Sequence, residues 1–458
     1  MGARKVYMQK FSTYILRSTF LLAVFLIAYM AEKRDFSQAN YNEILHFGLY
    51  YIFPVLLFSF ICIGISFIKK PIQTVTLVYM GAIIFAIYAA EIYLQYTAHD
   101  YTSNITRAAQ EHNYSYDERN MEEVLSDLSR NTKAYPFFTV RREYKDLLPL
   151  GSIPDVLTVY CNELGQYMKF VTDRHGFNNP NAIWNEESID IVALGDSFTH
   201  GACMPENNGF VNMIRNEYSS IINLAIGGNN PQANLAAMIE YALPKRPKYI
   251  LWFHYAGNDL SGITQDKGHQ MYNKYIYEDF LQNLIQRENE VEGEMLKFYE
   301  ENKHRILNVT KKSIYEKIIL KQVLKLYYVR TRLGQSRNLD DVFDFRLFHD
   351  IMKKAKETAK AANSKLIFIN IPVLGQAFIS DSDPNYRKTY DTIHALGIEW
   401  LDISSAIISS EDPSGLYAFR GSGGHFSYKG NRLVAEVLLE KILSKSSLIP
   451  HARAVEVE

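Results

Sequence analysis

A short apolar segment followed by a polar turn, residues 189–201, most constrains what this chain can fold into. Asp190 to Leu194 is rich in β-forming residues and predicts a buried strand. Gly195 ends that strand, and Asp196 and Ser197 are residue types that cap helices. Ser197 is therefore expected at the carboxyl end of a strand, where open α/β sheets bind ligands. A serine there either caps a helix or acts as a nucleophile, and this segment alone leaves both open.

Further segments predict strands that alternate with helices. Strands are expected at residues 221–224, 248–254, 365–371 and 398–403, and helices at 207–218, 345–363, 384–396 and 428–444. Together with the first strand, this alternation predicts an α/β fold with a doubly wound, parallel, five-stranded sheet.

Three later motifs also follow predicted strands, and residues at the carboxyl ends of parallel strands can take part in chemistry at one edge of the sheet. Gly227-Gly228 follows the second strand, Gly257-Asn258-Asp259 the third, and Gly424-His425 the fifth. With the Gly-Asp-Ser turn, and in this order, they resemble the SGNH (GDSL-type) hydrolase superfamily. The segment 173–177, Asp-Arg-His-Gly-Phe, is similar to a lead-in found in membrane-anchored bacterial members. The resemblance covers roughly residues 170–445 and implies a flavodoxin-like sheet.

The resemblance also implies the roles of individual residues. Ser197 would attack a carbonyl carbon, and His425 would be general base and then general acid. The oxyanion would be held by the Ser197 N–H, the Gly228 N–H and the Asn258 amide, with Asp196 in support. Read without the family, the glycine is an ordinary turn residue and the asparagine an Asx-turn residue.

The sequence departs from the family pattern just before His425. The family usually has an Asp two or three residues earlier, but this chain has Ser422 and Gly423. The imidazole would then be oriented by the Ser422 hydroxyl, by a backbone carbonyl or by a carboxylate from elsewhere. The acidic residues that are near in sequence are Asp402, Glu411 and Asp412.

The first hundred residues contain three apolar runs. Thr13 to Ala31, interrupted only by Arg17, Ile44 to Ile68 and Thr74 to Tyr93 predict three transmembrane helices. A cleaved signal peptide is the competing interpretation of the first run. The basic residues before the first and after the second run place the N-terminus in the cytoplasm. Everything after about residue 97 is then periplasmic, as expected for an integral protein of a bacterial inner membrane.

These patterns divide the chain into four parts. Residues 1–97 are a membrane anchor, 98–170 a linker or cap, 171–448 the hydrolase-like domain and 449–458 a tail. An insertion at 268–335 is rich in helical spacing. It could cover the active-site edge or lay a basic helix on anionic lipid, but a helical hairpin packed on the sheet is favoured.

Composition and cysteine content restrict the partners. A formal net charge of −1 over 458 residues gives no reason to expect a nucleic-acid partner. No cofactor and no metal site are implied. Cys161 and Cys203 could form a disulfide or remain two buried free thiols.

The leading hypothesis is a membrane-anchored periplasmic serine esterase. By resemblance, its substrate is an O-acyl group, acetyl foremost, on a cell-surface polysaccharide or glycolipid. One alternative is an O-acetyltransferase that uses the same site with a membrane acyl-donor partner. Another is an inactive SGNH fold that acts as a scaffold or binding subunit of an envelope assembly.

Overall fold

The structure is a computed structural model, and its two compact units are described separately. It describes residues 2–32, 48–98, 101–140, 146–307, 323, 326–332, 343–374, 383–420 and 423–443. One unit comprises residues 1–99 and 313–342, and the other comprises residues 100–312 and 343–458.

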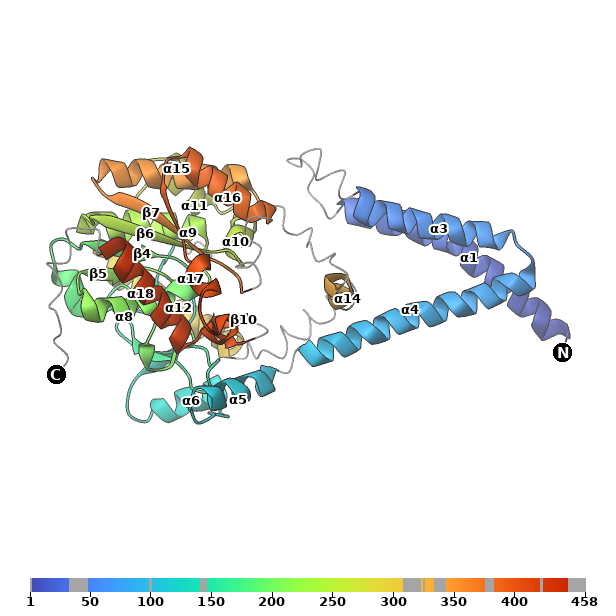
Figure 1. Ribbon diagram of the computed structural model, residues 1–458, viewed down its shortest axis with the longest axis horizontal. Helices are drawn as coiled ribbons and strands as arrows, with labels where there is room; N and C mark the ends of the chain where they lie inside the picture. The colour runs from blue at the N-terminus through green and yellow to red at the C-terminus, as the bar shows by residue number, and fades with distance from the viewer. Residues whose placement is uncertain are drawn as a thin grey trace. The chain divides into compact units, whose positions relative to one another are not determined.

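The first unit is built from long apolar helices (Figure 1). They are α1 (Gly2–Glu32), the π-helical turn η1 (Gly48–Ile52), α3 (Phe53–Ser66) and α4 (Lys70–Ala98). By length and composition, the segment Pro71–Gln95 of α4 is able to cross a membrane, whereas the apolar helices Thr13–Tyr29 and Phe53–Ser66 are shorter. One of the three predicted spans therefore meets both criteria. The start of the second predicted span lies outside the described residues.

Polar side chains join the helices of this unit. The Gln73 amide accepts a hydrogen bond from the Thr13 hydroxyl at 2.8 Å and donates to the carbonyls of Ser66 and Ile68, each at 2.8 Å. Farther along α4, the buried Glu91 carboxylate accepts the backbone N–H groups of Tyr328 at 3.0 Å and Val329 at 2.8 Å. These two residues lie in the first turn of the short helix α14 (Tyr327–Arg332). Segments of the chain 237 residues apart are thus joined at α4 by a buried carboxylate.

The second unit contains a parallel five-stranded sheet in the order β5-β4-β6-β7-β8 (Figure 1). Its strands are β4 (Ile191–Leu194), β5 (Ile221–Asn223), β6 (Tyr249–Tyr255), β7 (Lys365–Ile371) and β8 (Glu399–Asp402). Each lies within one residue or so of a predicted strand. The order confirms the flavodoxin-like sheet, in which the chain reverses direction beside the first strand.

Alternate residues of the strands enter two cores, because side chains of a strand point to opposite faces. Val192 and Trp252 belong to the core beneath α9 (Pro231–Ala237), α11 (Gln270–Tyr277), α15 (Phe345–Ala361) and α16 (Pro384–Ala395). Ala193 and Phe253 belong to the core beneath α8 (Phe210–Glu217), α17 (Ser404–Ile408) and α18 (Tyr428–Leu438). The two sets of helices cover opposite faces in Figure 1. Burial on both faces explains why the strands are almost wholly apolar.

The segment before the sheet forms a smaller layer with its own three-stranded sheet. It contains α5 (Tyr101–Glu111), α6 (Met121–Leu128), β1 (Ala134–Pro136), β2 (Leu157–Val159) and β3 (Lys169–Val171). Strand β2 pairs parallel with β1 and antiparallel with β3.

The lead-in motif at 173–177 is held by one buried carboxylate. Asp173 accepts the backbone N–H groups of His175 and Phe177, each at 2.9 Å, and the side-chain N–H groups of Asn179 and Trp184, each at 2.8 Å. The carboxylate of Asp173 is thus occupied by four hydrogen bonds that lie outside the reaction site. Asp173 is therefore a structural residue that fixes the entry to β4.

The first part of the predicted insertion packs into the core. Helices α11 and α12 (Glu288–Leu307) supply Tyr275, Val291 and Met295 to the core of the α9 face. The hairpin over 268–335 stays a prediction, since 308–322, 324–325 and 333–335 lie outside the described residues. The remaining short elements are η2 (Asn181–Asn185), α7 (Ser197–His200), η3 (Pro205–Asn207), η4 (Met238–Ala242), η5 (Leu243–Lys245), α10 (Asp259–Gln265), η6 (Leu284–Arg287), η10 (Pro413–Leu416), β9 (Tyr417–Phe419), β10 (Gly423–Phe426) and η11 (Leu439–Leu443).

Candidate active site

The strand order brings three of the sequence motifs to one place. β4 lies between β5 and β6, with Ala193 opposite Asn223 and Leu194 opposite Trp252. The turn after β4 carries Ser197, and the turns after its two neighbours carry Gly228 and Asn258. Because the strands are parallel, all three turns lie at the same edge of the sheet.

The turn that carries Ser197 is tight. A Cβ atom at Gly195 would lie 2.3 Å from the Thr199 hydroxyl, so only glycine fits between β4 and the short helix α7. Asp196 caps α7 by accepting the Phe198 N–H at 3.0 Å, and its other oxygen lies 3.3 Å from Ser197 Oγ. The serine is therefore the first helical residue rather than the capping one, which leaves its hydroxyl available to another partner.

That partner is His425. Its Nε2 atom lies 2.9 Å from Ser197 Oγ, although the two residues are 228 positions apart. His425 belongs to β10, which pairs antiparallel with β9, whereas the sequence indicated only a turn before the last helix. The predicted meeting of serine and imidazole is present, and the histidine is delivered by a strand.

A carboxylate that the sequence did not indicate holds the other side of the ring. Glu163 Oε1 lies 3.1 Å from His425 Nδ1, and Glu163 Oε2 accepts the His425 backbone N–H at 2.8 Å. The side chain of Glu163 is only 12% exposed. Glu163 thus completes a Ser-His-Glu arrangement in which the acid orients the imidazole and fixes the proton on Nδ1.

A disulfide ties this carboxylate to the serine turn. Cys161 and Cys203 are bonded, with their Cα atoms 4.7 Å apart. One lies two residues before Glu163 and the other six residues after Ser197, so the bridge joins the acid and the nucleophile covalently. Cys203 Sγ also lies 3.4 Å from His425 Nδ1. Because this sulfur is oxidised, the close group of Glu163, Cys203 and His425 lacks the thiolate that a metal site would use.

Two of the three acids named for their proximity in sequence, Asp402 and Asp412, have other partners. Asp402 accepts the Tyr386 hydroxyl at 2.6 Å, and Asp412 pairs with Arg420 at 2.8 Å. Ser422 lies outside the described residues.

The charges around His425 favour its protonated form. Burial by itself lowers the pKa of the imidazole, but the Glu163 carboxylate and, to a lesser extent, Asp196 more than offset it. The pKa of His425 is therefore raised above its usual value of 6.5. A more basic imidazole is a better acceptor for a hydroxyl proton, as long as the solution is alkaline enough to keep the ring neutral.

Asp196 lies in an unusual electrostatic position. Burial and the nearby Asp259 raise its pKa to about 7, while hydrogen bonds from the Phe198 N–H and the Asn258 side chain act in the opposite direction. Asn258 is thereby held by the residue next to Ser197, and its amide faces the serine turn. This contact fixes the third of the three turns against the first.

The glycine pair after β5 is shaped by a tyrosine. A Cβ at Gly227 would lie 2.0 Å from the Tyr160 hydroxyl oxygen, so the ring of Tyr160 lies directly against the turn. Gly228 follows with φ of +87°, a conformation that favours glycine. Both glycines are thus required by local geometry.

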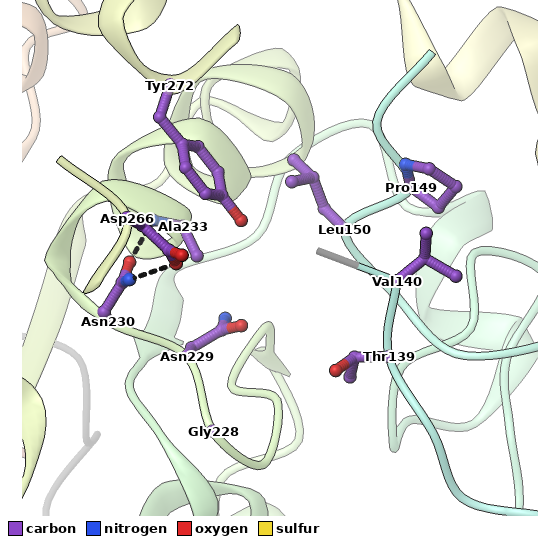
Figure 2. A pocket seen from close by; sticks show the side chains of 10 residues that line it. All are labelled: Thr139, Val140, Pro149, Leu150, Gly228, Asn229, Asn230, Ala233, Asp266 and Tyr272. Carbon is purple, nitrogen blue, oxygen red and sulfur yellow. Dashed lines mark hydrogen bonds between the residues drawn. The ribbon is translucent and has the colours of Figure 1, made fainter. Parts of the chain in front are cut away.

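A narrow cavity lies on the far side of this turn (Figure 2). Tyr272 and Asn229 point into it from opposite sides, and Asp266 accepts a hydrogen bond from Asn230 at 2.7 Å at its margin. It has room for about one water molecule. Neither Ser197 nor His425 is among its lining residues, so this cavity is distinct from the reaction site.

Several solved structures with a similar fold are described as lipases, acylhydrolases or esterases. A lipase/acylhydrolase from Enterococcus faecalis matches with 11% identity and a TM-score of 0.33, covering 57% of this chain and 100% of its own. An acetyl xylan esterase matches with 13% identity and a TM-score of 0.32, over 56% and 100% of the two chains. A variant of an acetyl-xylooligosaccharide esterase from Geobacillus stearothermophilus has 12% identity and a TM-score of 0.32, over 58% and 99%.

The sequence matches no family profile, and a search of curated proteins finds no significant match. At such identities and TM-scores the structural likenesses do not decide the reaction, which has to be inferred from the site itself. The sheet order, the four motifs and the paired serine and histidine together place the catalytic unit in the SGNH hydrolase fold.

Proposed function

We propose that this protein is an SGNH-type ester hydrolase, with Ser197 as nucleophile. The observation that carries the proposal is the continuous contact from Ser197 Oγ through the His425 ring to Glu163, at 2.9 and 3.1 Å. A hydroxyl in contact with an imidazole that is itself oriented by a carboxylate is the arrangement that activates serine in acyl transfer.

The reaction then proceeds through an acyl-enzyme. Ser197 Oγ attacks the ester carbonyl while its proton passes to His425 Nε2, and the Glu163 carboxylate stabilises the imidazolium. The Ser197 and Gly228 N–H groups and the Asn258 amide hold the oxyanion. Collapse releases the alcohol, which takes the proton from His425. Water then attacks the acyl-enzyme and gives a proton to His425. Collapse releases the acid, and His425 returns the proton to Ser197 Oγ.

We further propose that the enzyme is anchored in a bacterial inner membrane by three helices and acts in the periplasm. The apolar helices of the first unit and the disulfide support this location, since disulfides persist in oxidising compartments. The proposed substrate is an O-acetyl group of a cell-surface polysaccharide or glycolipid. Among the similar structures, two are esterases of acetylated xylan or xylo-oligosaccharide.

The inactive-scaffold alternative loses its main support. It rested on the missing acid before His425, and Glu163 places a carboxylate oxygen 3.1 Å from His425 Nδ1. Transfer of an acyl group from a membrane donor to a sugar hydroxyl would use the same residues. It differs from hydrolysis only in the group that attacks the acyl-enzyme, which is a sugar hydroxyl instead of water.

The test is turnover by the full-length chain purified in detergent. We expect hydrolysis of p-nitrophenyl acetate and labelling by a fluorophosphonate, and we expect Ser197→Ala to abolish both. Ser129→Ala is the matched control, because this exposed hydroxyl after α6 donates to the Ser126 carbonyl at 2.9 Å and belongs to none of the three turns. Activity that persists in Ser197→Ala would refute the assignment, and a product that forms only with an added sugar acceptor would indicate transfer.

A further inference from the structure

Two tyrosines lie on opposite sides of the serine turn. Tyr160 contacts the turn after β5 through its hydroxyl oxygen, as described for Gly227. Tyr255 ends β6, and its ring stacks on Phe198 with centroids 3.9 Å apart. Because β5 and β6 are the two neighbours of β4, Tyr160 lies against the turn on one side of β4, and Tyr255 ends the strand on its other side.

Neither phenol hydroxyl has a hydrogen-bond partner within the part of the chain that the structure describes. Both residues are partly exposed, and neither hydroxyl is among the buried side-chain atoms that lack a partner, so both hydroxyls reach the surface. The pKa of each is raised by burial, with further contributions from the Asp196 and Glu163 carboxylates. Both hydroxyls therefore stay protonated at neutral pH and can donate as well as accept.

The rings are also held rigidly. Tyr160 packs on Phe137 at a centroid distance of 4.0 Å, and Tyr255 is held by Phe198, whose ring lies 5.1 Å from that of His425. A phenol fixed in this way presents a flat apolar face and one polar tip at little entropic cost.

We infer that Tyr160 and Tyr255 determine specificity by binding hydroxyl groups of a carbohydrate on both sides of the scissile ester. This inference rests on the proposed function and names the residues that would select its substrate class. A sugar ester satisfies the two phenols and covers their faces with its C–H groups. The acyl chain of a lipid ester offers no hydrogen-bond partner, so it would leave both hydroxyls unpaired after excluding water.

The test compares kcat/KM for two acetyl esters on the full-length protein. One is a mono-O-acetylated methyl glucoside, and the other is p-nitrophenyl acetate, which has no alcohol hydroxyls. We expect Tyr160→Phe and Tyr255→Phe each to lower the ratio of sugar ester to p-nitrophenyl ester by about threefold to tenfold. Tyr390→Phe is the matched control, because this tyrosine in α16 is 39% exposed and keeps its ring contact with Trp400 as phenylalanine.

The outcomes separate this inference from the proposed function. If the wild type cleaves p-nitrophenyl acetate through Ser197 but the two variants leave the ratio within twofold of the control, the specificity assignment is wrong and the esterase assignment stands. A wild type that favours p-nitrophenyl laurate over the sugar ester would also overturn the assignment. Absence of any turnover would refute both.

Discussion

The replacement of Glu163 by Gln tests the part of the site that the sequence did not reveal. Gln has nearly the same shape but no charge, and only one of its two terminal atoms can accept a hydrogen bond. It can therefore serve either His425 Nδ1 or the His425 backbone N–H, which now lie 3.1 and 2.8 Å from separate carboxylate oxygens. A hydrogen bond to a charged group contributes about 1.5–3 kcal/mol, so kcat/KM should fall roughly 10- to 150-fold.

The pH profile of this variant gives a second, independent measurement. The imidazole must be neutral to accept the Ser197 proton, so activity rises with pH through the pKa of His425. Glu163 raises that pKa by stabilising the imidazolium, and its neutral replacement should move the acidic limb of kcat/KM to lower pH. Glu217→Gln, at the exposed end of α8, is the matched control. A Glu163→Gln enzyme with kcat/KM within twofold of wild type and an unmoved acidic limb would refute the triad.

Three other changes probe the surroundings of the site. Cys161→Ser removes the bridge to Cys203 and should lower the free energy of unfolding, measured by urea denaturation, by about 2–4 kcal/mol. The variant should also lose part of its activity, and unchanged stability and activity would contradict the role given to the bridge. Gly227→Ala should lose most of its activity, because the new Cβ would lie 2.0 Å from the Tyr160 hydroxyl oxygen. Adding Tyr160→Phe should restore part of the activity, since the Cζ atom of the ring is 3.0 Å from that Cβ. Additive losses in the double variant would argue against this clash. Burial raises the pKa of Asp196 to about 7, so the folded state keeps a proton that the unfolded chain releases above about pH 4, and stability falls as the pH rises from about 4 to 7. Asp196→Asn should remove this fall, which amounts to roughly 2–3 kcal/mol between pH 5 and pH 8 and is measured by thermal unfolding at the two values. An identical pH dependence in both proteins would refute it.

The sequence was sufficient for the sheet and for the serine and histidine. Apolar runs buried on both faces are continuous in sequence, and the residues after β4, β5 and β6 meet because parallel strands share an edge. Local patterns therefore located Ser197 and His425, whose meeting follows from the fold that the motifs indicate.

The acid could not be found in the same way. Glu163 lies 262 residues before His425, in a segment that shows no resemblance to the family, and its contact depends on the packing of two separate layers. The only sequence feature that pointed to Glu163 was the cysteine pair. A disulfide between Cys161 and Cys203 was one of two alternatives for these residues, and it brings the neighbourhood of Glu163 to the serine turn. His425 was likewise expected only as a residue just before the last helix, because the short β9–β10 pairing depends on contacts that periodicity does not record.

The division of the chain into two units has a consequence for its release by proteases. The polypeptide passes from one unit to the other near residues 99, 312 and 342, so three separate peptide links connect them. A single cut after His99 would separate residues 1–99 covalently from the rest of the chain. The second unit would then be retained only through the segment 313–342, whose residues Tyr328 and Val329 donate hydrogen bonds to Glu91 of α4. Release into the surroundings after one cut would therefore require this non-covalent contact to dissociate.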